Sequence, residues 1–585
     1  MVQTTFRTDS GSSDDRIIVP MGLVRLIRSG FKRYRLHELI DSFKDAGTPM
    51  GIVIENLCIA SLDGRYSMND LDQYINRSDL RREFYCGQHE IRRWTMDRDL
   101  QRLGDYLEEV VMHLNKVMRH LYPDEPTHTY VDGSHVKRYG PKGHNVRYGE
   151  GGGTIQLQDQ FMIATSMSLG MPVSVELYPG NQNDPTQYSD FIPQLMFLLK
   201  RGSMLVMDNG GSASEVLDDI VGSFNAYLTR VRINLSDEKA ISEGKDRMLY
   251  IGLGAACIMR TFASSQRTTY LYFSVDSYAA GLCRAEKAVK TLEDERLKAL
   301  KVIKEGNAEK LIRKPKNPFY EVEISGAKIV VTGDPWVEID PDKKLKESIP
   351  TKNGWFKLEC SFPMDPRLAL IVYRHRVDIE YAISILKSTI NMAPLRVWDE
   401  CSTRGKLVLG MIVEFILFAA INDMEAEMKT KVIDGKPVSV PVKPSARTLV
   451  KELKRYEGVV KAYPWGSFHI DHVRDDDVLD PLLKVIDIYD SEGPLELPEG
   501  RLELTLPTAQ WDDGRKNCKD LAMSIAQFFA ETKFPEFMVG RRHWKDVDPA
   551  SLVLYSEPFG VDRGSFGTNG LRGKTSFYDM ADWTT

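Results

Sequence analysis

The sequence predicts an α/β protein built from several parts. Strand-like segments rich in β-branched and aromatic residues lie between residues 127 and 233, and they alternate with helical segments. The chain before them has helical periodicity, and a mixed segment interrupts the pattern before it resumes near residue 365. With 585 residues, the chain is long enough to bury more than one core.

The composition is that of a soluble globular protein, with 42% hydrophobic and 27% charged residues. The longest apolar stretch, near Leu407–Ile421, is about fifteen residues long and contains Glu414, so we expect a buried helix and no membrane span. The first fifteen residues are polar and show no secretory signal. Seven scattered cysteines without a CxxC pair favour reduced thiols, so we expect a cytoplasmic protein.

The charge is distributed unevenly along the chain. A net charge of −6 does not favour nucleic-acid binding. However, Asp471–Glu503 holds eleven acids and three bases, whereas Arg16–Lys44 holds seven bases and two acids. The sign of the charge in each segment therefore matters more than the overall charge, and a nucleic-acid partner is not excluded.

Residues 1–15 are expected to form a disordered tail, and residues 16–126 a helical N-terminal DNA-binding domain. The clearest helix is predicted over Asp97–Leu121, with Thr95 as its N-cap. Arginines gather where it begins, at positions 92, 93, 98 and 102. A short helix, a turn and a second helix opened by arginines are typical of a helix-turn-helix DNA reader. An ordinary helical bundle with a solvated basic face is the alternative.

Residues 127–235 contain strands and helices in a characteristic order. Three strands come first, the last two meeting in a tight hairpin at Gly170; a helix over Asp184–Lys200, a buried strand ending at Asp208, a helix near Ser212–Val221 and a strand near Ala226–Ile233 follow. This order predicts a ribonuclease-H-like catalytic core. In that fold the first and fourth strands are neighbours, so Asp132 and Asp208, each predicted at a strand end, would lie close together.

Residues 236–364 interrupt this core. They contain strands, a charged helix near Arg284–Glu305 and too many residues for a loop, so we predict a β-rich insertion domain. The core resumes over residues 365–430. Residues 431–585 are predicted to form a C-terminal extension of unknown role.

One helix is predicted over Tyr373–Lys387. Its polar residues Tyr373, Arg376, Glu380 and Lys387 follow at steps of three, four and seven, so they fall close to one helical stripe. Taken alone, this stripe could be an ion-pair ladder on the surface. The two upstream aspartates favour a functional site instead.

Asp132, Asp208 and Glu380 are predicted to be catalytic and to bind metal. Three carboxylates that converge repel one another unless a cation lies between them. Oxygen ligands suit Mg²⁺ or Mn²⁺, and two such ions roughly 4 Å apart support phosphodiester chemistry. A single aspartate at a strand end is more often a turn or cap residue, so the prediction depends on the joint placement of all three.

These residues also carry a family resemblance. The spacing Tyr373-x2-Arg376-x3-Glu380-x6-Lys387 resembles the signature of DDE transposases of prokaryotic insertion sequences, in the group with a β-rich insertion before the glutamate. The blocks YVDGSHVKRYG and LVMDNGGSASEVLDDI, and the segment after Glu380, are similar to family segments. The resemblance covers residues 127–430 and, more loosely, 16–126. Asn209 departs from the residue that is commoner in the family.

The resemblance implies metal-dependent DNA transposition with two Mg²⁺ or Mn²⁺ ions: cleavage at the inverted repeats of a transposable element, then strand transfer into target DNA. It implies a homodimer in a synaptic complex with double-stranded DNA, associated with the nucleoid. Tyr373, Arg376 and Lys387 would contact DNA, and an aromatic residue of the insertion would stack on it. Trp355 is the first candidate for that residue and Trp336 the second, although a tryptophan at a strand start could pack in a core instead.

Two other functions stay open. One is a domesticated or inactive relative that binds DNA without cutting it. The other is a metal-dependent DNA nuclease of the same fold. All three acids and the complete Tyr–Arg–Glu–Lys set are present, which disfavours the first alternative. The inserted domain suits end recognition better than simple hydrolysis, which disfavours the second.

Overall fold

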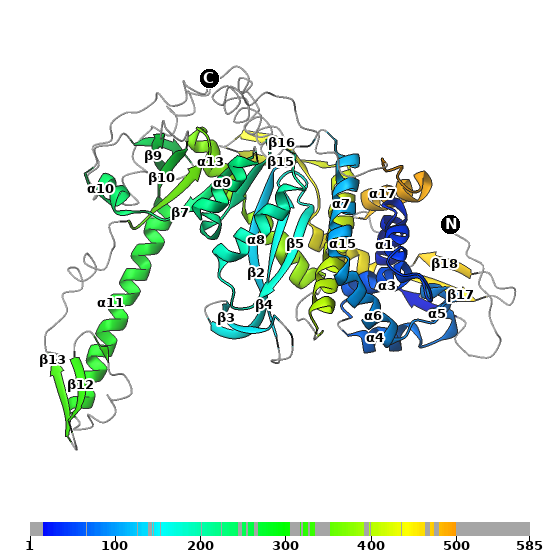
Figure 1. Ribbon diagram of the computed structural model, residues 1–585, viewed down its shortest axis with the longest axis horizontal. Helices are drawn as coiled ribbons and strands as arrows, with labels where there is room; N and C mark the ends of the chain where they lie inside the picture. The colour runs from blue at the N-terminus through cyan, green and yellow to red at the C-terminus, as the bar shows by residue number, and fades with distance from the viewer. Residues whose placement is uncertain are drawn as a thin grey trace. The chain divides into compact units, whose positions relative to one another are not determined.

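The protein is a mixed α/β protein with one mixed sheet and many helices, seen here in a computed structural model (Figure 1). The described residues are 16–498 except 66, 124, 126, 139–142, 144, 152–153, 201, 224, 244–247, 253–254, 262–266, 305–315, 318–319, 326–327, 334–351, 391–396, 398, 434–435, 463–467 and 473–478. The predicted tail, residues 1–15, and the end of the C-terminal extension, residues 499–585, lie outside them.

The chain forms two compact units. Of the described residues, the first comprises those within 16–229, 360–362 and 368–498, and the second comprises those within 230–359 and 363–367. Both units are therefore built from separate stretches of the chain.

The first unit begins with seven helices among its described residues: α1 Met21–Arg33, α2 Leu36–Asp41, α3 Met50–Asp63, α4 Met68–Ile75, α5 Asp79–Cys86, α6 Arg93–Asp105 and α7 Leu107–Leu121. The prediction of one helix over Asp97–Leu121 is wrong, because the chain breaks at Tyr106. Gly104, a poor helix former, lies just before the break. The predicted cap is also wrong: Thr95 is buried in the first turn of α6, and Arg92 is the N-cap residue.

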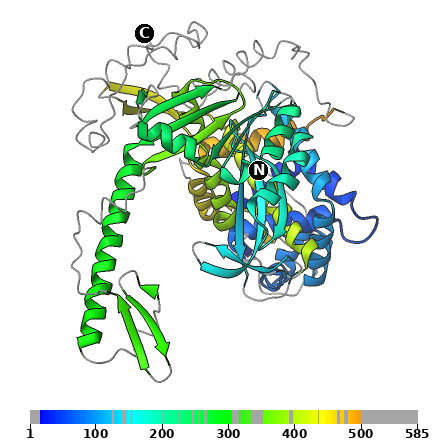
Figure 2. The ribbon, with the colours of Figure 1, turned by 60° about the vertical axis from the view of Figure 1, so that its left-hand side comes forward.

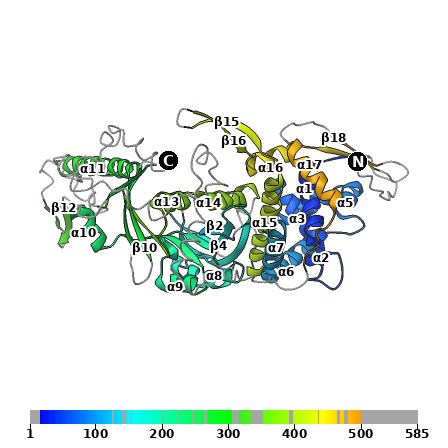
Figure 3. The same ribbon diagram turned by 90° about the horizontal axis from the view of Figure 1, so that it is seen from above.

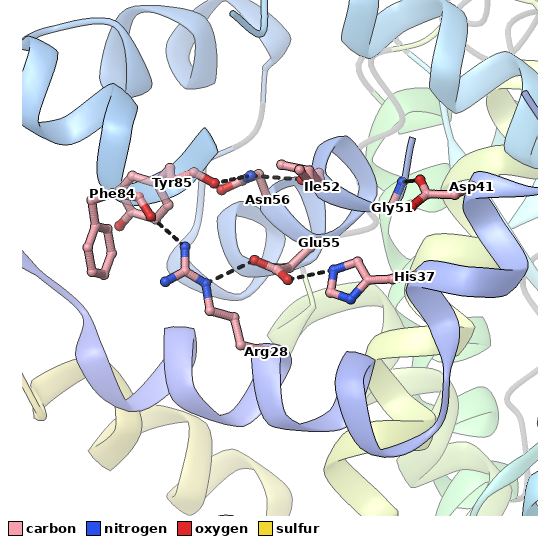
Figure 4. A network of polar contacts seen from close by, with 9 residues as sticks. All are labelled: Arg28, His37, Asp41, Gly51, Ile52, Glu55, Asn56, Phe84 and Tyr85. Atoms are coloured by element: carbon pink, nitrogen blue, oxygen red, sulfur yellow. Dashed lines mark hydrogen bonds and ion pairs between the residues drawn. The ribbon is translucent and has the colours of Figure 1, made fainter. Parts of the chain in front are cut away.

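A polar network around the buried Glu55 ties four of these helices together (Figure 4). Its carboxylate accepts hydrogen bonds from Arg28 Nε at 3.0 Å and from His37 Nε2 at 2.9 Å. Arg28 also donates to the carbonyl of Phe84 at 2.7 Å. Burial raises the pKa of Glu55, but His37 and Arg28 outweigh burial and leave the pKa below its usual value. The network thus fixes α1, α2, α3 and α5 through a buried charge that is paired.

Part of the predicted C-terminal extension packs on these N-terminal helices (Figure 3). The elements concerned are α16 Ala446–Arg455, β17 Gly458–Ala462, β18 Phe468–His472 and α17 Asp480–Glu492. Strand β1, Arg16–Val19, pairs antiparallel with β17. The hydroxyl of Tyr34, the C-cap residue of α1, donates to the Tyr489 hydroxyl on α17 at 3.0 Å, and Ser29 Oγ donates to Asp490 at 2.6 Å. No sequence pattern predicted this association.

The sheet of the first unit contains β2 Thr129–Lys137, β3 Arg147–Gly151, β4 Thr154–Ser166, β5 Pro172–Pro179, β6 Met204–Met207 and β7 Ala226–Val231. Its order is β3-β4-β2-β6-β7, with β5 also paired to β4. β2 pairs antiparallel with β4 and parallel with β6, and β6 pairs parallel with β7. The predicted neighbourhood of the first and fourth strands is therefore confirmed, whereas β3 was not predicted.

Helices α8 Asp184–Met196 and α9 Ser214–Gly222 connect these strands, close to the predicted positions. Asn183 caps α8 by accepting from the Thr186 N–H at 3.1 Å.

Helix α15, Glu400–Asp423, is the central helix of the first unit and packs against α6, α7 and β5 (Figure 1). The predicted burial of its apolar stretch is confirmed, and Glu414 is fully buried within it. By length and composition α15 is the one described helix that could span a membrane, yet 78% of its most apolar window is buried in the protein. The hairpin of β15 Glu427–Ile433 and β16 Lys436–Val442 follows it.

The second unit pairs β8 Leu249–Gly252, β9 Ala255–Thr261, β10 Thr268–Ser274 and β14 Trp355–Cys360 in the order β14-β10-β9-β8. It also contains α10 Leu235–Glu243 and α11 Val275–Lys304, which begins earlier than the predicted charged helix. A second small sheet, β11 Lys316–Asn317, β12 Tyr320–Ser325 and β13 Lys328–Gly333, lies near the distal end of α11 (Figures 1 and 2).

Candidate active site

Asp132 and Asp208 follow directly on the parallel ladder between β2 and β6. The last paired residues of that ladder are Val131 and Met207, so both aspartates leave it at the same level. Asp208 ends its strand as predicted. The prediction that Asp132 ends its strand is wrong, because β2 continues to Lys137 through its pairing with β4. Asp132 therefore sits on a rigid, hydrogen-bonded strand.

Asp208 is held by a tight turn. Its carboxylate Oδ1 accepts from the Gly210 N–H at 2.7 Å, capping the short 3₁₀ helix Asn209–Gly211. Thr229 Oγ1 donates to the Asp208 carbonyl at 2.8 Å. A Cβ on Gly210 would lie 2.8 Å from Cβ of Asp184, so only glycine fits between this turn and α8.

The Arg376 guanidinium joins two of the predicted carboxylates. Nη1 donates to Asp132 Oδ2 at 2.7 Å, and Nη2 donates to Glu380 Oε1 at 3.1 Å. Burial raises the pKa of Asp132 to about 6; Arg376 opposes this rise, and the nearby charge of Asp208 adds to it. The Gly133 N–H also donates to Asp132, at 3.0 Å. The site thus concentrates negative charge around one partly buried cation.

The predicted single helix over Tyr373–Lys387 is wrong. The chain forms α13 Pro366–Arg374, α14 Val377–Ser384 and a π-helix over Ile385–Thr389. Between α13 and α14 the backbone tightens into i→i+3 turns: the Arg376 N–H donates to the Tyr373 carbonyl at 3.1 Å, and the Ile379 N–H to the Arg376 carbonyl at 3.1 Å. These turns place Arg376 at the start of α14.

The stripe is also no surface ion-pair ladder. The Arg376 side chain is only 17% exposed and binds Asp132 on a distant strand, whereas Glu380 is 56% exposed. Tyr373 is half-buried at the end of α13, close enough for its phenol to act on the charge of Arg376.

Lys387 lies in the π-helix and reaches β2. Its Nζ donates to Ser134 Oγ at 2.6 Å and lies 5.6 Å from the ring centre of Phe161. Burial lowers its pKa to about 8, against the opposing effect of Asp132. Single-turn π-helices occur often at functional sites, which fits this position beside the aspartates.

Trp355 belongs to the second unit, where it opens β14. It packs on the cluster of Ile258, Leu271 and Phe273, with 5.4 Å between its ring centroid and that of Phe273. Its predicted DNA contact stays a prediction. Trp336 lies outside the described residues.

The site contains carboxylates that could bind a metal ion, but two of them, Asp132 and Glu380, are paired with the Arg376 guanidinium. In the described part of the chain, no three His, Cys, Asp or Glu side chains are grouped so that they could hold a metal ion. Asp132 and Glu380 instead share Arg376 as their counter-ion. Their carboxylate oxygens are the donor type that Mg²⁺ and Mn²⁺ prefer, so the chemistry of the donors fits such an ion.

Sequence reasoning missed three residues of this site. Ser134, the partner of Lys387, lies two residues after Asp132 on the same face of β2, so strand alternation could have identified it. Tyr188 is fully buried and donates to the Val131 carbonyl at 3.2 Å. Asp184 opens α8, and both burial and the charge of Asp208 raise its pKa. Asp184 was predicted only as the start of a helix, and no sequence signal pointed to Tyr188.

Comparisons with known proteins add a weak likeness. No family model matches the chain, and no curated protein matches it. Among solved structures, the chain is similar to a piggyBac transposase in a synaptic complex with hairpin DNA, with a TM-score of 0.35 and 10% identity over 86% of this chain and 85% of that chain. A likeness at this level establishes neither a shared fold nor a shared activity.

Proposed function

We propose that the chain is a DNA transposase of the insertion-sequence DDE type, which cuts and joins phosphodiesters at a site formed by Asp132, Asp208 and Glu380. One observation carries the proposal. Arg376 of the Tyr–Arg–Glu–Lys stripe bonds both Glu380 and Asp132, although Asp132 lies 244 residues away in sequence from Arg376. Residues chosen from separate sequence blocks therefore meet in one place.

The order of the strands supports a ribonuclease-H-like core. The first three long strands run antiparallel as β5-β4-β2, and β6 and β7 continue parallel to β2. This strand order is the one that the succession of strands and helices along the sequence predicts for a ribonuclease-H-like core. Asp132 lies on β2 and Asp208 directly follows the neighbouring strand β6.

Asp132, Asp208 and Glu380 are the residues that would hold Mg²⁺ or Mn²⁺. When bound, two such ions supply activation of the attacking oxygen and stabilisation of the leaving oxygen. Arg376 now pairs with both Asp132 and Glu380. In the proposed reaction its planar guanidinium turns to a phosphate of the DNA, for which its paired donors are suited.

Lys387 and Tyr373 are the other residues that contact DNA in this proposal. Ser134 holds the Lys387 ammonium beside β2, so the charge is already oriented before DNA arrives. Tyr373 lies at the end of α13, where its phenol acts on the charge of Arg376. The proposed partners are the double-stranded ends of a transposable element and a target DNA, bound by a homodimer in the cytoplasm.

The test uses the DNA that flanks the coding region. A fragment carrying both flanks is incubated with the protein, Mg²⁺ and a supercoiled target plasmid, and the products are sequenced. We expect nicks at repeated ends and joining of those ends to the plasmid. Cuts without joining would support a metal-dependent nuclease instead, and retention of the fragment without any cut would support a DNA-binding relative.

A further inference from the structure

We propose that the exposed face of α6 binds a strand of DNA, with an unpaired base stacked on Trp94 and phosphates on the arginines around it. The partner follows from the proposed function, on which this inference rests. The residues belong to the first unit and are distinct from the candidate active site.

Trp94 is an unusual side chain to leave in solvent. It lies in the first turn of α6 and is 60% exposed, whereas Met96, Leu100 and Leu103 of the same helix are buried. The Arg98 guanidinium covers part of the indole, with its Cζ 4.4 Å from the ring centre. The indole is thus backed by a cation and still offers apolar surface to a ligand.

Arginines surround this indole. Arg98 and Arg102 continue the stripe of Trp94 at steps of four residues, and Arg92 and Arg93 precede it; all four arginines are exposed. The nearby acids have partners of their own: Glu90 pairs with Arg92, which also lies 4.0 Å from Asp72; Asp97 pairs with Arg93 at 3.5 Å, and Asp99 with Lys44 at 3.1 Å. Among the described residues, Arg98 and Arg102 form no salt bridge. Arg98 and Arg102 therefore keep guanidinium donors that a ligand on this face can use.

The buried side of α6 keeps this face in place. A Cβ on Gly104 would overlap the carbonyl of Cys401, and one on Gly405 would overlap the carbonyl of Leu100, so α6 and α15 are in backbone contact. Arg93 also lines a cavity of about 110 Å³, together with Arg65, Asp97 and Lys406. A rigid basic face needs little reorganisation to bind an extended anion.

Charge and ring chemistry together favour a nucleic-acid strand as the occupant. Arginines neutralise successive phosphates, and an exposed aromatic ring stacks on any base whose face is free. An acidic protein surface would match the arginines but would leave the indole without a stacking partner. A duplex would match the phosphate contacts, but its bases are stacked on one another.

The test is fluorescence anisotropy with a single-stranded oligonucleotide and its duplex, without divalent metal and over a series of salt concentrations. Trp94→Ala is expected to weaken single-strand binding roughly five- to one-hundred-fold, with a smaller effect on the duplex. Trp94→Phe keeps most of the affinity. Arg98→Ala and Arg102→Ala each reduce the single-strand salt slope by about 0.7. Phe197→Ala, which removes an exposed aromatic ring at the C-cap of α8, leaves binding unchanged.

Three outcomes would overturn this inference: wild-type affinity in Trp94→Ala, equal losses for single strand and duplex, or no DNA binding by the wild type. Circular dichroism of each variant shows whether it has folded. The result is separable from the proposed function. Trp94-dependent binding by a protein that never cuts DNA would refute the transposase proposal and leave this surface standing.

Discussion

At the scale of single residues, Arg376 decides how the candidate site is built. Its side chain is mostly buried and bonds one carboxylate on β2 and another on its own helix. Removing it would leave Asp132 with an uncompensated charge in a site where burial already raises its pKa to about 6. Arg376 therefore holds the acids together until a ligand replaces it.

Lys387 gives the site a dependence on pH. Burial lowers its pKa to about 8, so its ammonium loses its proton between about pH 7 and 9, where an exposed lysine stays charged. We expect the affinity of the wild type for DNA to fall several-fold over this interval. Lys387→Arg should hold its affinity, because guanidinium does not titrate there. Fluorescence anisotropy without divalent metal measures the DNA affinity of both proteins as a function of pH. The same fall in affinity with pH for the two proteins would contradict this role for Lys387.

Glu414 makes a prediction about stability. It is fully buried in α15, and neither carboxylate oxygen has a hydrogen-bond partner among the described residues. Burial raises its pKa, so the folded state keeps the proton while the unfolded state releases it above about pH 4.3. Its contribution to stability is thus fully present below that pH and decreases as pH rises toward the folded pKa.

Glu414→Gln removes this decrease in stability with rising pH, because the glutamine amide does not ionise. We expect the variant to be more stable than the wild type by about 1–3 kcal/mol at pH 8, and nearly equal to it at pH 4. Urea unfolding at the two pH values measures the difference. A variant that is less stable at pH 8 would show that Glu414 is ionised and paired in the fold.

At the scale of elements, the contact between α6 and α15 depends on two glycines. Ala at Gly104 or Gly405 would place a methyl group on the facing backbone, which no rotamer change can relieve. We expect each substitution to destabilise the protein by about 1–3 kcal/mol, despite the better helix propensity of alanine. Gly222→Ala is the control, because nothing lies within 4 Å of a Cβ there. Equal unfolding midpoints for all three variants would refute the close contact.

The helix boundaries show where sequence patterns stop being informative. Periodicity predicted the buried face of α7, and a long apolar stretch predicted the burial of α15. It failed between Tyr373 and Lys387, which contains neither proline nor glycine. The turns at Arg376 accompany its bond to Asp132 on a distant strand, and a window of local sequence does not contain that partner.

At the scale of the whole molecule, the order of segments was the strongest guide. Strands and helices in a known succession allow few topologies, so the contact between β2 and β6 could be predicted. The packing of α17 on α1 could not, because it joins residues more than 450 positions apart through tyrosine and aspartate contacts without a recognisable motif. For the same reason, Asp132 and Asp208 could be paired from sequence, but the buried Tyr188 beneath them could not.

The central claim is that Asp132, Asp208 and Glu380 together cut DNA. Its most direct test is Mg²⁺-dependent cleavage of the flanking DNA by Asp132→Asn, Asp208→Asn and Glu380→Gln, beside the control Asp190→Asn on the exposed face of α8. We predict that each of the three loses cleavage by at least about a thousand-fold while still binding the DNA, and that the control cuts like the wild type. Undiminished cleavage by Asp132→Asn or Asp208→Asn would contradict the account.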